Sequence, residues 1–578
     1  MTTDPAVTRF PYEDSTLEIN QRVEDLLARM TPEDKAGVMF QPLAMFDLDA
    51  PGYFGTPSTR EILNRRINHF NILGAPTVRE IAEWHNMIQR EALKTPLGIP
   101  ITISSDPRHA FTDNPALALQ SGPFSQWPEP LGFGAIGSEE LVERWAEVVR
   151  REYRAVGIRL ALHPQIDITT EPRWPRQSGT FGESAELTSR LGVAYIRGLQ
   201  GVAVGPDSVS AMAKHFPGGG PQKDGEDPHY QAGREQVYPG NQFELHLEPF
   251  RAALKAGVSQ MMPYYGMPVA EGMEPVGFSF NKAIISDLLR IELGFDGIVC
   301  SDWGILSGMF WGVEELTFEE RMLKALDAGV DQFGGETRTD VLENLIRTGG
   351  VDLAKIDNSV RRIVAEKFKL GLFDERRFVD VEQAEIIIAS ADSRAEGLAA
   401  QAAAVTVLTN QDGAAHLPLA RGARVYAEGL DAAALANFAQ LVDTPEDADV
   451  AIIRTASPWE QLGEPGTLES MFHRGSLEFS AHETARIRAV AAIVPTILDV
   501  ALERPSILAP FVDDSISLLV NFGASSEAIA KVLFGELPAK GRLPFEIPSS
   551  MQAVLDSDSD TPFDTANPTF RFGFGLEL

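Results

Sequence analysis

Residues 295–304 read FDGIVCSDWG, a short apolar run that ends in polar and aromatic side chains. Residues 298–300 have the β-branched or small side chains that favour a buried strand. In a parallel α/β barrel the carboxyl ends of the strands face the active site, so Asp302 and Trp303 are candidate site residues. The alternative from this segment alone is that Asp302 caps the next helix, because aspartate is a favoured N-cap residue.

The same unit recurs through the first 375 residues. Short apolar runs alternate with polar turns and with longer patterns of period 3.6, which is typical of βα units with parallel strands. The predicted strands are 99–104, 158–168, 209–213, 258–262 and 295–300, and the predicted helices include 78–93 and 141–156.

A charged segment separates this part of the chain from a second one. Residues 371–395 contain no strand pattern, and from residue 402 the apolar runs resume with the spacing of an open, doubly wound sheet. We therefore predict a first domain over 1–375 with an N-terminal extension, a linker over 376–395 and a second domain over 396–578. The predicted strands of the second domain are 405–408, 423–426, 450–453, 496–500 and 516–521.

Polar or aromatic side chains follow each of the five predicted strands of the first domain. Carboxylates, cations and aromatic rings together suit a site that hydrogen-bonds a polyol and stacks on its apolar face. Glycosidic cleavage needs an ionised carboxylate near the anomeric carbon and a protonated carboxyl near the leaving oxygen. The strand-end residues are Asp106 with Arg108 and His109, Asp167 with Arg173 and Arg176, Lys214 with His215, Tyr264 with Tyr265, and Asp302 with Trp303.

Composition and short motifs exclude several classes of protein. The 578 residues include 50 basic and 82 acidic side chains, and the net charge of −32 repels nucleic acid and anionic membranes. Cys300 is the single cysteine and no HExxH motif is present, so we expect neither a disulfide nor a bound metal. Lys214 precedes the glycines of KHFPGGG, whereas the lysine of a phosphate-binding loop follows them. The N-terminal residues lack the pattern of a secretion signal, so we expect a cytoplasmic location.

Taken in order along the chain, these motifs resemble those of glycoside hydrolase family 3, which includes many β-glucosidases, β-xylosidases and exo-glucanases. The motifs are PRWPR followed by FGES, KHFPG, MMPYY, GIVCSDWG and, in the second domain, LLVNFGASSEAIAKVLFGELPAKGRLPFEIP. The resemblance covers nearly the whole chain. It implies a TIM-type (β/α)8 barrel or near-barrel followed by an α/β sandwich that contributes a loop to the site.

The resemblance also implies roles for the strand-end residues. Asp302 matches the catalytic nucleophile of the family's SDW motif, and Asp106 matches the aspartate that binds distal sugar hydroxyls. Trp303 would line the aglycone side of the pocket. The remaining sugar-binding positions around the first subsite are matched by Arg176, Lys214, His215 and Tyr265.

The general acid/base of the family is usually a glutamate in a variable loop of the second domain, often in a Pro-aromatic-x-Glu context. The corresponding stretch here, 456–470, reads ASPWEQLGEPGTLES. Glu460 is our first choice and Glu464 and Glu469 are its competitors, and we expect Glu460 to be buried beside Trp459. The alternative is that all three are solvated loop charges, because exposed glutamate is the rule.

Two departures from the family pattern bear on specificity. Family members that cleave N-acetylglucosaminides often carry KHFPGHG with the last histidine as acid/base, but this chain has Gly219 there, which disfavours that branch. Residues 332–335 read QFGG where the family often has an apolar Met pair.

The sequence thus predicts a cofactor-independent, retaining exo-β-glycosidase, with β-glucosidase as the first choice. Its substrate would be a small β-glycoside or oligosaccharide, with no nucleic acid or membrane partner and a possible homodimer. The alternatives are a β-xylosidase or other β-glycosidase of the same family, phosphorolysis instead of hydrolysis, and a sugar-binding homologue without catalysis.

Overall fold

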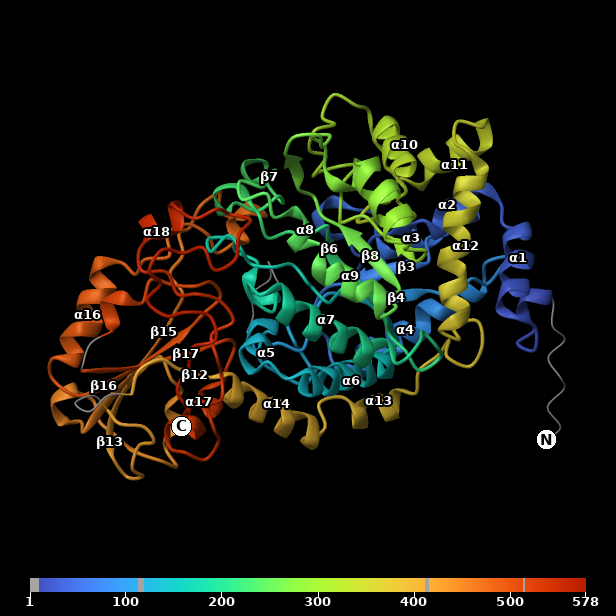
Figure 1. Cartoon of the computed structure of the whole chain (residues 1–578). Helices are drawn as coiled ribbons and strands as arrows, with labels where there is room; N and C mark the ends of the chain where they lie inside the picture. The colour runs from blue at the N-terminus through green and yellow to red at the C-terminus, as the bar shows by residue number, and fades with distance from the viewer. Residues whose placement is uncertain (1–9, 113–118, 411–414, 513–514, 578) are drawn as a thin grey trace.

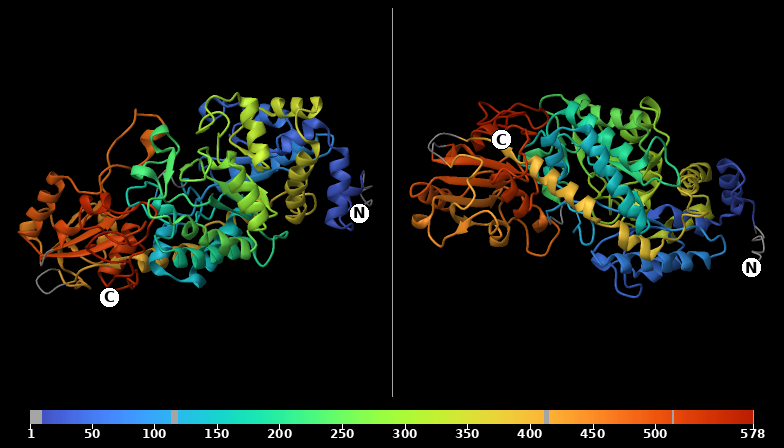
Figure 2. Two further views of the ribbon diagram at one scale, coloured as in Figure 1. Left: turned by 45° about the horizontal axis from the view of Figure 1, so that its top comes forward. Right: turned by 90° about the horizontal axis from the view of Figure 1, so that it is seen from below.

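The computed structural model describes residues 10–112, 119–410, 415–512 and 515–577. The segments up to α12 (Leu353–Lys369) form one domain, and those from β12 (Thr406–Val407) onward form a second domain beside it (Figure 1). The helix α1 (Ile19–Arg29) lies at the end of the first domain that is far from the second (Figure 2).

The first domain is built on a parallel sheet of seven strands in the order β10-β8-β6-β5-β4-β3-β2. A separate parallel pair joins β1 (Phe40–Gln41) to β11 (Phe333–Gly334). Only Pro42 lies between β1 and β2, and a parallel bridge joins Cys300, next to β10, to Gln332, next to β11. The β1-β11 pair is thus linked to both ends of the seven-stranded sheet, to β2 through the chain and to β10 through this bridge. The seven strands are β2 (Leu43–Ala44), β3 (His69–Ile72), β4 (Thr102–Ser105), β5 (Ile158–Ala161), β6 (Ser210–Phe216), β8 (Gln260–Pro263) and β10 (Ile298–Val299).

Side-chain chemistry explains these elements locally. All the residues of β6 (SAMAKHF) are buried, because a central parallel strand is covered on both faces. The side chain of Thr77 accepts a hydrogen bond from the backbone of Glu80, and the Glu80 side chain accepts one from Thr77 in return, so that a capping box starts α4. Besides α1 and α12, the helices of this domain include α4 (Val78–Leu93), α6 (Glu139–Ala155), α7 (Ala185–Gln200), α9 (Glu248–Lys255), α10 (Phe318–Ala328) and α11 (Thr339–Thr348).

Some sequence predictions need correction. The strand predicted over 158–168 ends at Ala161, because Pro164 has no N–H with which to continue the ladder. Within the described residues no helix starts at Asp302, and the next helix, α10, is capped by Thr317. The N-cap interpretation of Asp302 is therefore wrong.

The second domain has a six-stranded sheet in the order β12-β17-β16-β15-β13-β14, in which only the pairing of β12 with β17 is antiparallel. Alternate residues of β15 (Val450–Ala456) point to opposite faces: Ala451 and Ile453 belong to one hydrophobic core, and Val450 and Ile452 to another. Helices cover both cores, which confirms the predicted α/β sandwich. The other elements are β13 (Arg424–Glu428), β14 (Gln440–Leu441), β16 (Thr496–Ala501), β17 (Ile516–Asn521), α15 (Ala432–Leu435), α16 (Ala481–Ala491), α17 (Ser526–Leu533) and α18 (Met551–Leu555).

Polar contacts join the two domains and the segment between them. This segment contains α13 (Val381–Ile387) and the start of α14 (Ala391–Ala404), and Val379 exchanges two backbone hydrogen bonds with the Asn86 side chain of α4. The carboxylate of Asp560, fully buried, accepts hydrogen bonds of 2.7 and 2.8 Å from the backbone of Gly240 and Gln242. The Asp560 contacts thus tie the second domain to residues 240–242 of the first domain.

Candidate active site

Four strands of the first domain bring the predicted site residues to one edge of the sheet. Asp106 follows β4, Lys214 lies in β6, Tyr265 follows β8 and Asp302 follows β10. Because β4, β6, β8 and β10 belong to one parallel sheet, their carboxyl ends lie at the same edge.

Asp106 and Lys214 form an ion pair at this edge. The ammonium of Lys214 donates a 2.8 Å hydrogen bond to Oδ1 of Asp106, and the amide of Asn71 donates one of 3.1 Å to Oδ2. Burial opposes ionisation of Asp106, but Lys214 and Asn71 hold its pKa below its ordinary value. The carboxylate is therefore ionised at neutral pH and can accept hydrogen bonds from sugar hydroxyls.

His215 is held between a carboxylate and a guanidinium. Its Nδ1 lies 2.8 Å from Oδ2 of Asp167, and Nη1 of Arg176 lies 3.1 Å from its Nε2. Burial and the charges of Arg176 and Lys214 lower the pKa of His215 well below its ordinary value, so the ring is neutral. The neutral ring donates from Nδ1 to Asp167 and accepts from Arg176 at Nε2.

Asp302 is buried beside this group. Its Oδ1 accepts a 2.8 Å hydrogen bond from the backbone N–H of Trp303, and its Oδ2 lies 4.0 Å from Nε2 of His215. Oδ2 is buried and has no hydrogen-bond partner among the described residues. Burial raises the pKa of Asp302, and the charges of His229, Arg176 and Lys214 oppose that rise. One carboxylate oxygen is thus anchored and the other is left for a substrate atom.

The sequence reasoning missed two residues of the site, Asp227 and His229. Oδ2 of Asp227 accepts hydrogen bonds from Trp174 and Tyr264, and Oδ1 lies 2.5 Å from Nδ1 of His229. The ring of His229 then packs on that of Tyr265, with the ring centres 4.7 Å apart. The available signal was the acidic and histidine pair in GEDPHY, downstream of KHFPGGG.

Three strand-end residues serve the framework instead. Arg108 donates hydrogen bonds to the backbone carbonyls of Ile72 and Gly74, and His109 bonds to the buried Glu152. Arg173 forms an ion pair with its neighbour Glu171. Cys300 is buried against Leu160, Leu162, Met212 and Met262, in agreement with a packing role.

The glycines of QFGG make room for Trp303. A Cβ on Gly334 would lie 2.7 Å from Cε3 of the indole, and one on Gly335 would lie 3.0 Å from Cδ1. Gly335 also has a φ of +72°, which favours glycine. The indole therefore occupies the space beside residues 334–335 that larger side chains would fill.

The loop with the candidate acid/base lies at the domain boundary, but Glu460 is not buried. Glu460 is exposed, and Trp459 is 42% exposed and stacks on His473 with ring centres 4.3 Å apart. The expected burial of Glu460 beside Trp459 is wrong, because His473 takes the indole face. Glu464 is exposed as well, and Glu469 forms an ion pair with Arg474.

This loop nevertheless contacts the site side of the first domain. The ring of Phe472 lies 5.1 Å from that of His229 and 5.7 Å from that of Tyr230. Because His229 packs on Tyr265, the loop is one residue removed from the sugar-binding group. The second domain therefore closes one side of the candidate site.

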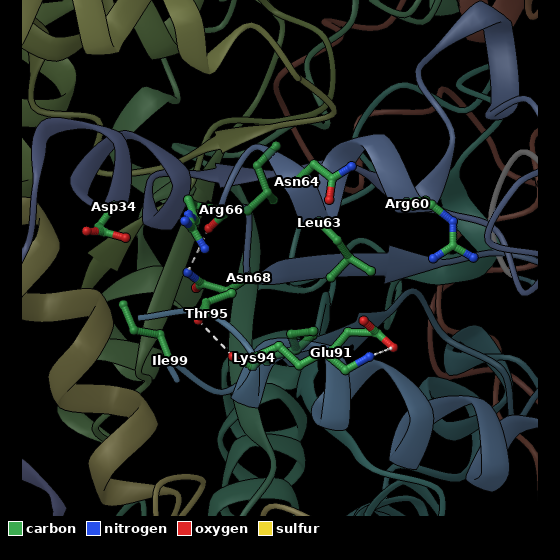
Figure 3. Close-up of a pocket in the computed structure, with 13 residues that line it drawn as sticks. Asp34, Arg60, Leu63, Asn64, Arg66, Asn68, Glu91, Lys94, Thr95 and Ile99 are labelled. Carbon is green, nitrogen blue, oxygen red and sulfur yellow. Dashed lines mark hydrogen bonds and ion pairs between the residues drawn. The ribbon is translucent and has the colours of Figure 1, made fainter. Parts of the chain in front are cut away.

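A separate cavity of about 360 Å³ lies at the opposite edge of the sheet (Figure 3). Asn68 and Ile101, which line it, directly precede β3 and β4. It thus lies at the amino ends of the strands, where stability and not catalysis is expected in such domains.

The described part of the chain has neither a metal-binding cluster nor a membrane-spanning helix. There, no three histidine, cysteine, aspartate or glutamate side chains gather in a way that would hold a metal ion. Among the described helices, none combines the length and the apolar character that crossing a bilayer requires.

Comparisons with known proteins agree with this geometry. Models described as the glycosyl hydrolase family 3 N terminal and C-terminal domains match residues 71–365 and 308–578. Beta-glucosidase C of Emericella nidulans is 47% identical over 98% of this chain and 93% of its own length. A Dickeya chrysanthemi protein named periplasmic beta-glucosidase/beta-xylosidase is 41% identical over 98% of this chain and 91% of its own length.

Solved structures show the same fold. A β-glucosidase from Erythrobacter marinus has a TM-score of 0.82 at 21% identity and covers 98% of this chain and 84% of its own. The β-glucosidase from Listeria innocua in complex with glucose has a TM-score of 0.77 at 21% identity, with 97% and 83% covered.

Proposed function

This chain belongs to glycoside hydrolase family 3, and we propose that it is a retaining exo-β-glycosidase that releases a terminal non-reducing sugar, with β-glucosidase as its activity. The observation that carries the proposal is the environment of the two carboxylate oxygens of Asp302. Its Oδ1 is anchored by the Trp303 backbone, and its buried Oδ2 faces a group of sugar-binding side chains. This is the arrangement that a carboxylate nucleophile needs.

In the first step, Oδ2 of Asp302 forms a bond to the anomeric carbon while the bond from that carbon to the leaving oxygen breaks. Glu460 donates its proton to the leaving oxygen. In the second step, the Glu460 carboxylate takes a proton from water, the water oxygen bonds to the anomeric carbon, and Asp302 leaves as a carboxylate. The two displacements retain the anomeric configuration.

The polar group around Asp302 would hold the sugar in the first subsite. Asp106 accepts from hydroxyls, and Lys214 and Arg176 donate to them, while His215 and Tyr265 complete the wall. A site of this kind rejects sugars that leave its buried polar groups unpaired. Trp303 would line the aglycone side, where its ring lies across Gly334 and Gly335.

Glu460 is proposed as acid/base because its loop reaches the site side of the first domain through Phe472 and His229. Glu469 is committed to an ion pair with Arg474, and Glu464 remains the competitor. The exposure of Glu460 fits a loop that becomes covered when the aglycone binds, since apo geometry often differs from that of the substrate complex.

A second activity, β-xylosidase, is supported by the Dickeya chrysanthemi relative, whose name includes both activities. Kinetics with 4-nitrophenyl β-glucoside, β-xyloside and N-acetyl-β-glucosaminide distinguish β-glucosidase activity from β-xylosidase and N-acetylglucosaminidase activity. We expect kcat/KM to be highest for the glucoside. A protein that binds these sugars without turnover would contradict the proposal, and sugar 1-phosphate formed on addition of phosphate would indicate phosphorolysis.

We also keep the expected cytoplasmic location and the expected homodimer as proposals. Cell fractionation of the native host tests the first. Size-exclusion chromatography with light scattering tests the second.

A further inference from the structure

The loop between β15 and α16 leaves the second domain and lies on the first. Its Phe472 packs on His229 and Tyr230, and its residues 459–467 are exposed. Glu460 lies in the exposed part. The position of Glu460 therefore depends on the contacts that fix the ends of this loop.

Arg504 fixes the base of the loop. Arg504 is 1% exposed, and its guanidinium donates to the backbone carbonyls of Pro458 and Gly475, one on each arm of the loop, at 2.7 and 3.2 Å. It also donates at 3.0 Å to the carbonyl of Arg173 in the first domain. Both arms are thus tied to one turn of the other domain.

Arg474 fixes the return arm closer to Glu460. Its side chain is 7% exposed and forms ion pairs with Glu226 of the first domain and Glu469 of the loop itself. The guanidinium carbon lies 4.6 Å from the centre of the Tyr230 ring. A buried arginine with two carboxylates and an aromatic face has a single favourable position.

The backbone of Arg474 transmits this position to Glu460. The N–H of Glu460 donates a 2.8 Å hydrogen bond to the carbonyl of Arg474, in an antiparallel bridge. The next residue, Gly475, has a φ of +89°, and a Cβ there would lie 2.2 Å from Oε2 of Glu460. The Glu460 carboxylate therefore lies directly over the residue that follows Arg474.

We propose that Arg474 is a positioning residue: its ion pair with Glu226 across the domain boundary holds the loop so that Glu460 can reach the leaving oxygen. This inference rests on the proposed function. In this proposal Glu469 serves to hold Arg474 through their ion pair, whereas Glu460 serves as the acid/base. The ion pair between Arg474 and Glu226 also explains how a carboxylate from a second domain can serve a nucleophile in the first.

The test compares substrates that do and do not need protonation of the leaving group. In Arg474→Met, kcat/KM for phenyl β-glucoside should fall about 10- to 100-fold, because a displacement of about 1 Å costs a catalytic group this much. For 2,4-dinitrophenyl β-glucoside, kcat/KM should fall less than about 3-fold, because this leaving group needs little acid catalysis. Glu226→Gln should show the same selective loss of activity on phenyl β-glucoside. The double variant Arg474→Met/Glu226→Gln should lose little more activity than either single variant, because the two residues act through one ion pair.

Arg486→Met is the matched control, since Arg486 also pairs with two glutamates, Glu428 and Glu483, but within the second domain. This control variant should leave the ratio of kcat/KM for phenyl β-glucoside to kcat/KM for 2,4-dinitrophenyl β-glucoside unchanged. Arg474→Lys should recover part of the phenyl glucoside activity. Equal losses for both substrates in Arg474→Met, or no loss, would overturn the proposal. Absence of turnover in the wild type would instead overturn the proposed function itself.

Discussion

Nζ of Lys214, in β6, lies 2.8 Å from Oδ1 of Asp106, which follows β4, so two strands of the parallel sheet share one ion pair at the sugar-binding edge. The side chain of Lys214 is 5% exposed, and that of Asp106 is 27% exposed. Each residue thus sets the charge and the direction of the other while keeping hydrogen-bonding capacity for a ligand.

Removal of either partner should weaken transition-state binding. In Lys214→Met and in Asp106→Asn, kcat/KM for 4-nitrophenyl β-glucoside should fall. The fall should correspond to a loss of about 1 to 3 kcal/mol in transition-state stabilisation, as expected for a lost charged hydrogen bond. The double variant should lose less than the sum, because the two residues act on each other. Wild-type kinetics in both single variants would place the pair outside the pocket.

His229 should control the acidic limb of the pH profile. Its charge opposes the rise in the pKa of Asp302 that burial causes. In His229→Asn the pKa of Asp302 should increase, so the nucleophile stays protonated to higher pH and the acidic limb of kcat/KM moves up. His416→Asn, in the second domain, is the control. An unchanged limb in His229→Asn would mean that His229 does not act on Asp302.

Glu460→Ala should separate the two catalytic steps. With 2,4-dinitrophenyl β-glucoside the first step needs little acid catalysis, so the glycosyl-enzyme still forms and added azide should accelerate turnover by replacing base-assisted water. Glu464→Ala, which changes another exposed glutamate of the same loop, should behave as wild type. Azide rescue in Glu464→Ala with a wild-type Glu460→Ala would move the role to Glu464.

Glu183 should make stability depend on pH. It is buried at the domain boundary, where it accepts hydrogen bonds from the backbone of Glu546 and Phe563, and burial raises its pKa to about 8 from 4.5. Between these values the folded state binds the extra proton, so this contribution to stability is complete below about pH 4.5 and is lost as the pH rises through about 8.

Glu183→Gln removes that titration. The free energy of unfolding in urea should therefore fall for the wild type relative to the variant as the pH rises from about 5 to about 8, and the difference should level off above that pH. A gap that stays constant with pH would show that Glu183 does not titrate between the two states.

Part of the site could be predicted because strand ends in a parallel sheet converge. Asp106, Lys214 and Asp302 each follow or end an apolar run, so the pattern placed them together. Asp227 and His229 lie in a loop without periodicity, and their partners Trp174 and Tyr264 come from distant segments, so only the folded chain shows the cluster.

Local sequence also failed to predict the contacts that fix the loop between β15 and α16, and it failed to predict the strands β1 to β3. Arg474 and Arg504 are charged residues in irregular segments, where solvent exposure is the ordinary expectation, yet both are buried. The strands β1, β2 and β3 were absent from the predicted set because Pro42 interrupts the first run and β3 contains the polar residues His69 and Asn71. Their burial depends on neighbouring strands that the local sequence does not reveal.

The central claim is that Asp302 is the nucleophile, and trapping the covalent intermediate tests it most directly. Incubation with a 2-deoxy-2-fluoro β-glucoside that carries an activated leaving group should inactivate the enzyme and add one fluoroglucosyl group to the peptide that contains Asp302, while Asp302→Ala should not be labelled and should lose several orders of magnitude in kcat. A wild-type enzyme labelled on another carboxylate would contradict the account.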